Sequence, residues 1–154
     1  MANKFKFRLQ PVLKLKEIRE QEIKNSLGRI VKEIESKNIR LNELKDDIQF
    51  YFDKYENAEI NKEKMLAGLR SYMPEFLTSH YEKIKNITQE IISLDFEKNK
   101  LINSLAMAKS QTKIFSNLKE KKFNEYKVQL NKKMEQEIEE LAIIKRGHDE
   151  INKN

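Results

Sequence analysis

The sequence predicts an all-α protein, a long two-helix antiparallel coiled coil (α-hairpin). Three observations predict this fold class: 36% of the residues are charged, the 154 residues include only 3 Gly and 2 Pro, and apolar residues recur every three or four positions. With so few turn-forming residues, the chain must lie in a few long elements, and its composition favours helices. Apolar spacing of about 3.5 residues keeps one stripe facing a partner helix. We expect residues 1–154 to form a single coiled-coil domain.

The first helix is expected to span about residues 11–67. Pro11 suits the first helical position, where its missing N–H would be unpaired in any case. From Ile23 onward a 4-3 spacing begins. Its members are Ile23, Leu27, Ile30, Ile34, Leu41, Leu44, Ile48, Tyr51, Tyr55, Ala58, Met65 and Leu69. Upstream, Val12, Leu15 and Ile18 are offset by about one residue, which predicts a change of register.

A turn is expected at about residues 68–74, where Gly68 and Pro74 lie close together. Because proline disrupts a helix interior, Pro74 is expected to open a second helix at about residues 75–146. Gly147 suits the position beyond its last turn. The pattern also allows the break to begin as early as Asn57. The second apolar repeat comprises Ile84, Ile87, Ile91, Leu94, Leu101, Leu105, Ala108 and Phe115.

Several function classes are disfavoured by what the sequence lacks. There is no Cys, and therefore no thiolate metal site and no cysteine nucleophile. No His-Glu-x-x-His, glycine-rich phosphate loop or Gly-x-Ser-x-Gly motif is present. A two-helix hairpin also offers little concavity for a reaction. We therefore expect no enzyme activity, no catalytic residues, no cofactor and no metal. No stretch approaches the roughly 20 apolar residues of a membrane span, so we expect a cytosolic protein without an integral membrane segment.

Aromatic residues cluster around the expected turn. Seven of the thirteen are Phe50, Tyr51, Phe52, Tyr55, Tyr72, Phe76 and Tyr81. Consecutive helical residues are about 100° apart, so Phe50, Tyr51 and Phe52 cannot all face one partner helix. At least one large aromatic should therefore be exposed. The cluster is compatible both with packing at the hairpin turn and with a protein-binding surface.

Positive charge gathers in two segments. In the N-terminal leader, Lys4, Lys6 and Arg8 alternate with apolar residues, and no acidic residue appears before Glu17. The run from Lys109 to Lys133 contains eight basic and two acidic residues. An antiparallel hairpin brings both segments to one end, which supports an electrostatic docking end, with an ordinary solvated surface as the alternative. Nucleic-acid binding is less favoured, because a basic-region coiled coil needs a dense Arg/Lys stretch that continues into the zipper.

The leader FKFRLQPVLKLKE at residues 5–17, followed by a charged helical chain with one central break, resembles the flagellar export protein FliJ family. The tyrosines at 51 and 55 and the phenylalanine at 76 also fit that family. The resemblance implies a non-enzymatic, coiled-coil component of the flagellar type III export apparatus. It would act as a central stalk that regulates the export ATPase and links it to the export gate. The alternatives are a generic coiled-coil scaffold, the stalk of a non-flagellar secretion system or, less favoured, a basic coiled coil that binds nucleic acid.

The resemblance also implies partners and a location. The partners would be the hexameric export ATPase FliI, the export gate protein FlhA and export chaperones. The location would be the cytoplasm, with peripheral association at the inner face of the cell membrane at the flagellar base. We assign ATPase binding to Phe5, Phe7, Arg8, Leu9, Leu13, Lys14 and Lys16. We assign export-gate binding to Ile48, Tyr51, Tyr55, Phe76 and His80.

Overall fold

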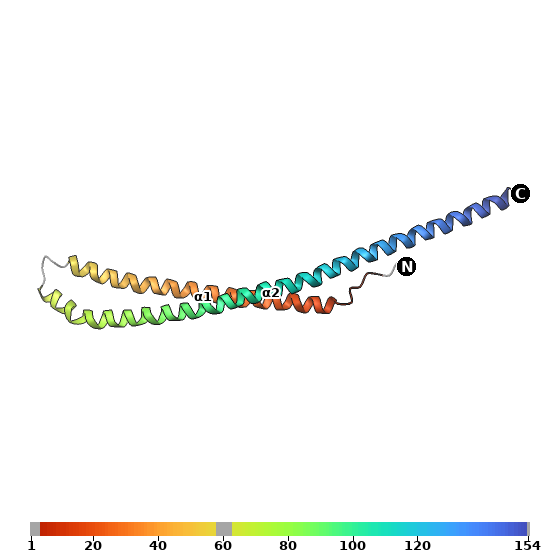
Figure 1. The fold of residues 1–154 in the computed structure, drawn as a ribbon. Helices are drawn as coiled ribbons and strands as arrows, with labels where there is room; N and C mark the ends of the chain where they lie inside the picture. The colour runs from red at the N-terminus through yellow and green to blue at the C-terminus, as the bar shows by residue number, and fades with distance from the viewer. Residues whose placement is uncertain (1–3, 58–62, 154) are drawn as a thin grey trace. The chain divides into compact units, whose positions relative to one another are not determined.

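The computed structural model describes residues 4–57 and 63–153, and these form two long helices (Figure 1). Helix α1 is Gln10–Asn57 and helix α2 is Glu63–Asn152, with no strand among the described residues. The contacts divide the chain into two units. The terminal unit combines Met1–Glu20 with Met107–Asn154, and the central unit is Gln21–Ala106. Each helix contributes to both units, which are described separately below.

In the central unit, α1 and α2 run antiparallel. Lys37 pairs with Glu90 at 2.7 Å between Nζ and Oε2. Ten residues further along α1 and ten residues back along α2, Asp47 lies 3.4 Å from His80. Steps of four residues in the same directions bring Tyr51 and Phe76 together, with ring centroids 4.1 Å apart. These pairings confirm the predicted all-α hairpin.

The core of the central unit is one narrow apolar stripe on each helix. Leu44 is the most buried residue, at 1% exposure, and Ile23 and Ile48 are also buried. The other described members of the two predicted repeats within this unit are half-buried. Ala58 lies outside the described residues, and the side chains of Met65 and Leu69 are not described. Burial at a 4-3 spacing is the arrangement expected when two helices pack along a coiled-coil seam.

Within the central unit, one described position of the α1 seam holds a cation. Lys37 is half-buried and donates a hydrogen bond to Glu90. This hydrogen bond raises the pKa of Lys37, and the negative charges of Glu90 and Glu33 raise it further, whereas desolvation acts in the opposite direction. A polar residue inside a seam fixes which residues face one another, because sliding the helices would separate the pair.

The predicted register change near the start of α1 is wrong. Leu15 and Ile18 are 65% and 45% exposed, whereas Leu13 is buried. Lys16 and Glu20 occupy the two seam positions between Leu13 and Ile23, and both are half-buried. The 4-3 spacing therefore continues unbroken from Leu13 to Ile23 along α1. The prediction followed apolar residues alone, but long charged side chains also cover apolar surface with their methylene groups.

The predicted turn at residues 68–74 is also wrong. α1 ends at Asn57, and the expected turn lies inside α2, including Pro74. The alternative of a break beginning at Asn57 is therefore correct for the end of α1. Packing accounts for the helix around Pro74, because Tyr72 and Phe76 on either side of it both contact Tyr51 of α1. Such tertiary contacts override a local propensity against helix.

The second helix extends beyond the predicted end at residue 146. α2 continues to Asn152, and Gly147 lies within it without a positive φ. A single glycine costs a helix only about 1 kcal/mol relative to alanine. The residues after Gly147 include no proline that would stop the helix. Gly147 therefore does not act as a C-terminal cap.

Replacing Gly28 by alanine should raise the free energy of unfolding by about 1 kcal/mol. Gly28 lies inside α1, and apart from its two chain neighbours and the local helix backbone no atom lies within 4 Å of the position a Cβ would occupy. The added methyl group therefore meets open space, and the helix gains propensity. Thermal or urea unfolding followed by circular dichroism measures the change, with the exposed Lys32→Gln as a near-neutral control. A less stable Gly28→Ala variant would contradict the described geometry.

Candidate functional site

The N-terminal leader of the terminal unit is extended and lies against α2. Residues 4–7 have no regular secondary structure, and the chain turns at residues 8 and 9 into α1. Lys4, Lys6 and Arg8 are exposed, whereas Phe5, Phe7 and Leu9 are half-buried. This two-residue alternation is that of an extended segment with one face on a surface. The leader therefore presents a basic face to solvent and an apolar face to α2.

Phe5 makes the described ring contacts between the leader and α2. Its ring centroid lies 5.2 Å from that of Phe123 and 5.5 Å from that of Tyr126. Lys127 lies over the Phe123 ring, with Nζ 4.6 Å from the centroid. Tilted aromatic pairs at such distances contribute about 0.5–1.5 kcal/mol beyond the area they bury. These contacts hold the leader beside a positively charged stretch of α2.

The first turns of α1 complete this surface. The backbone N–H of Leu13 donates to the carbonyl of Leu9 at 2.9 Å, and the Leu13 side chain is only 3% exposed. Lys16 donates a hydrogen bond to Gln111 of α2 at 3.0 Å, while Lys14 is exposed. The residues assigned to ATPase binding therefore all lie in the terminal unit. Of these, Arg8 and Lys14 are exposed, and the other five contribute at least partly to packing.

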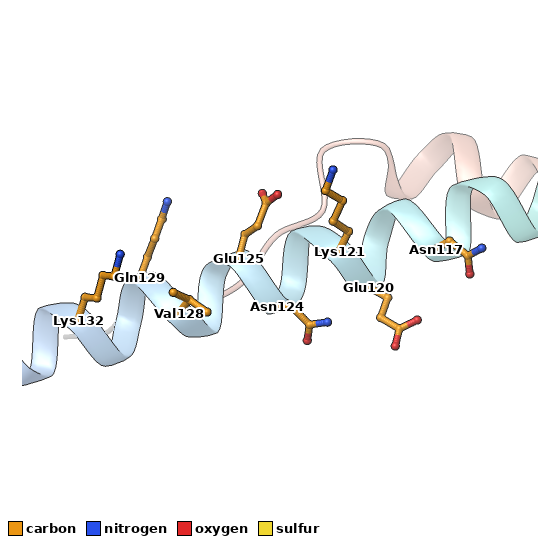
Figure 2. Close-up of a pocket in the computed structure, with 8 residues that line it drawn as sticks. All are labelled: Asn117, Glu120, Lys121, Asn124, Glu125, Val128, Gln129 and Lys132. Atoms are coloured by element: carbon orange, nitrogen blue, oxygen red, sulfur yellow. The ribbon is translucent and has the colours of Figure 1, made fainter.

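Among the shallow grooves along α2 in the terminal unit, two extend over several turns of the helix. One lies between the leader and α2, where α2 contributes Leu118, Lys122, Glu125, Tyr126 and Gln129. The other lies on α2 alone (Figure 2) and is lined by Asn117, Glu120, Lys121, Asn124, Glu125, Val128, Gln129 and Lys132. Both are open and combine charged or polar side chains with apolar surface, and Figure 2 shows the labelled side chains spread along the outside of one helix. Such surfaces suit contact with a macromolecule better than enclosure of a small substrate.

Beyond the leader, no helix among the described residues packs against α2. Every described residue from 131 to 153 is exposed. The segment nevertheless carries large apolar side chains at more than half exposure, namely Met134, Ile138, Leu141, Ile143, Ile144 and Ile151. A run of exposed apolar residues of this length is typical of a protein-interaction site.

The residues assigned to gate binding form the aromatic end of the central unit's seam. Phe76 is 9% exposed and contacts Tyr51, with its ring centroid also 3.9 Å from that of His80. Ile48 is buried, and the Tyr55 hydroxyl accepts a hydrogen bond from Arg70 Nε at 3.3 Å. The structure thus brings Tyr51, Phe76 and His80 together. Ile48 and Tyr55 lie on the same seam of α1, and all five residues are buried or half-buried.

His80 links the two helices at this cluster. Its Nδ1 lies 3.0 Å from the backbone carbonyl of Phe76, and its Nε2 lies 3.4 Å from the Asp47 carboxylate. Both partners are hydrogen-bond acceptors, so the ring donates from a nitrogen that carries a proton. The His80 side chain is 13% exposed, which leaves little of it for a partner protein.

The exposed aromatics lie beside the predicted residues. Phe50, Tyr72 and Tyr81 are 57%, 52% and 54% exposed, and Phe52 is 38% exposed. The Lys54 ammonium lies 4.6 Å from the centroid of the Phe50 ring. This confirms that the three consecutive aromatics cannot all pack inward. The same helical geometry would have identified Phe50 and Phe52 as better contact candidates than Tyr51, because they lie off the seam.

The described residues offer no metal site and no membrane span. Among them, no group of three or more His, Cys, Asp or Glu side chains is placed to hold a metal ion. No helix in the same part of the chain is long and apolar enough to cross a membrane.

Comparisons with known proteins identify the family. No curated protein and no solved structure is detectably similar to the chain. The family model described as flagellar FliJ protein matches residues 5–148, nearly the whole chain. The match includes the leader, the two helices and the aromatic cluster, and it confirms the resemblance seen in the leader. The chain therefore belongs to the FliJ family and is a component of the flagellar protein-export apparatus.

Proposed function

We propose that this protein is a non-enzymatic stalk that binds the hexameric export ATPase FliI through its terminal unit. The observation that supports this most directly is the unpaired stretch of α2 from residue 131 to 153, with its exposed apolar side chains. A helix that leaves so much apolar surface uncovered gains stability when a partner covers it. The neighbouring leader adds a basic face whose exposed members include Arg8, and α1 adds Lys14.

The stalk regulates the ATPase through differential affinity. A partner shifts a conformational equilibrium only when it binds one state more tightly than another. Two antiparallel helices present different side chains on different sides, so the six subunits of a ring meet unlike surfaces. This asymmetry favours unlike nucleotide states around the ring and stabilises the assembled hexamer.

The central unit forms the link to the export gate protein FlhA. The exposed rings of Phe50, Phe52, Tyr72 and Tyr81 supply the contact, while the predicted residues Ile48, Tyr51, Tyr55, Phe76 and His80 hold the two helices in position. Large exposed aromatics are typical of residues that dominate binding energy. Export chaperones bind the same protein, and the complex lies in the cytoplasm at the inner face of the cell membrane, at the flagellar base.

The ATPase proposal is tested by the hydrolysis rate and assembly state of FliI with and without this protein. The full chain should increase the hydrolysis rate at subsaturating FliI and raise the hexamer fraction in sedimentation experiments. A chain truncated after Leu130 should lose most of this effect, because it lacks the exposed apolar segment. Circular dichroism of the truncated chain should still show the melting transition of the hairpin. An unchanged rate and an unchanged assembly state with the full chain would rule the stalk role out.

A further inference from the structure

The packed stripe of α2 in the terminal unit continues into the exposed stretch of the same helix. Up to Leu130, half-buried residues of this stripe follow one another in steps of four or seven residues, namely Phe115, Lys119, Tyr126 and Leu130. Beyond Leu130, steps of four and three residues continue through six exposed positions. These are Met134, Glu137, Leu141, Ile144, His148 and Ile151. Because the six project within about 100° of one another, they form a single stripe, which we call the outer seam.

The outer seam has no helix packed on it among the described residues. Its four apolar members, Met134, Leu141, Ile144 and Ile151, are 52%, 65%, 66% and 74% exposed. A stripe with a 4-3 spacing is the pattern of a coiled-coil strand, whose apolar residues pack against a second helix of the same spacing. Most of the stability of helices in proteins comes from packing of this kind. The outer seam therefore fits a second helix with a matching stripe.

A second copy of the same segment supplies that helix when it runs antiparallel. With Leu141 opposite Ile144 of the second copy, the six seam residues form three kinds of layer, each present twice. The layers are Leu141 with Ile144, Met134 with Ile151, and Glu137 with His148. Apolar residues then meet apolar residues, and an imidazole that can donate a hydrogen bond meets the carboxylate. A shift of one heptad would instead place Glu137 opposite Leu141, or His148 opposite Ile144, and bury a polar group against an apolar one.

The charges of the segment also favour the antiparallel arrangement. Residues 134–140 contain four Glu and no basic residue, whereas residues 145–151 contain two basic and two acidic residues. A parallel pair sets residues 134–140 beside their own copy and places Glu137 opposite Glu137 of the second copy. An antiparallel pair sets residues 134–140 beside residues 145–151 instead. Since like charges in contact weaken an interface, spacing and charge lead to the same arrangement.

We infer that residues 131–153 of α2 pair with the same residues of a second copy as an antiparallel two-stranded coiled coil. The inference goes beyond the proposed function, because it concerns the chain in the absence of FliI. The interface covers only about three heptads, so the pairing is weak and reversible. It uses the apolar side chains that the proposed function assigns to the ATPase, so a second copy and the ring exclude one another. Self-pairing therefore covers this surface while the ring is absent.

Sedimentation of the full chain tests the pairing. The protein is measured in about 150 mM NaCl at about 5 to about 300 μM, a range in which weak pairs dissociate. A monomer–dimer equilibrium is expected. Ile144→Glu should raise the dimer dissociation constant by more than about 10-fold, because it places a charge in both layers formed with Leu141. The matched control is Ile143→Glu. Ile143 is 65% exposed but projects about 130° from the middle of the outer seam, so this variant should dimerise normally.

Exchange of the polar layer tests the orientation. His148→Glu alone should weaken the dimer about 10-fold, because it places a second carboxylate opposite Glu137. Combining it with Glu137→Lys should restore dimerisation, because in the antiparallel pair the new lysine and the new glutamate face each other. In a parallel pair the same double variant sets lysine opposite lysine and glutamate opposite glutamate, and it would not be rescued.

Each outcome bears on the inference alone, because FliI is absent from these measurements. A chain that stays monomeric at every concentration overturns the inference, and so does a dimer that tolerates Ile144→Glu. A dimer weakened equally by Ile144→Glu and Ile143→Glu would indicate general apolar association instead. A double variant no tighter than His148→Glu would rule out the antiparallel arrangement. Circular dichroism should show the same unfolding transition of the hairpin in every variant, because all the substituted side chains are exposed.

Discussion

Replacing Phe76 by alanine should lower the free energy of unfolding by about 3–5 kcal/mol. Phe76 is the most buried aromatic described in the central unit, at 9% exposure. Its ring contacts Tyr51, Tyr72 and His80, with centroid distances of 4.1, 6.1 and 3.9 Å. The shorter side chain leaves a cavity between the helices, and neighbours that belong to rigid helices cannot fully collapse into it. Urea unfolding followed by circular dichroism measures the loss.

Phe50→Ala is the matched control for this variant. Phe50 is 57% exposed on the same helix as Tyr51, so its removal should change stability by no more than about 0.5 kcal/mol. The Phe50→Ala variant should instead bind FlhA more weakly, because we propose that the exposed aromatic rings make the contact with FlhA. The opposite pattern, with Phe76→Ala stable but unable to bind FlhA, would show that Phe76 is itself a contact residue.

The seam was predictable from the sequence because it depends on spacing alone. Any stripe repeating every 3.5 residues faces one direction, so residues such as Leu44 and Ile48 follow directly from the pattern. The prediction failed where charged residues occupy seam positions. Lys16 and Glu20 are half-buried, whereas the apolar Leu15 and Ile18 face solvent. Residue type alone does not show which lysines bury the methylene groups of their side chains and which do not.

The candidate surfaces were predictable in position but not in detail. The alternation of basic and apolar residues in the leader predicted docking to a partner, whereas the structure shows Phe5 against Phe123 and Tyr126 of the chain's own α2. Which aromatics of the central unit remain exposed depends on the facing helix. The second helix was predicted to begin after Pro74. Tyr72, which faces Tyr51 from α2, was therefore assigned to the turn. A register that continues through Pro74 brings Tyr72 beside Tyr51, a pairing that no local signal indicates.

Replacing Pro74 by alanine should raise the free energy of unfolding by about 2 kcal/mol. Pro74 lies inside α2, where proline is about 3 kcal/mol less favourable than alanine because it lacks an N–H and its ring collides with the preceding turn. Alanine restores a donor for the carbonyl of Arg70, four residues earlier. Part of the gain is offset, because proline also restricts the unfolded chain by about 0.4–1 kcal/mol. The unfolding midpoint in urea measures the balance.

Pro11→Ala provides a control with the opposite expected sign. Pro11 lies in the first turn of α1, where the Phe7 carbonyl already accepts from the Gln10 N–H at 3.1 Å and the Leu9 carbonyl from the Leu13 N–H at 2.9 Å. Alanine gains no required hydrogen bond there and frees the unfolded chain, so stability should fall by about 0.4–1 kcal/mol. If both variants were stabilised equally, the effect would reflect general helix propensity. If Pro74→Ala were destabilised, Pro74 would instead be required for the contacts of Tyr72 and Phe76 with Tyr51.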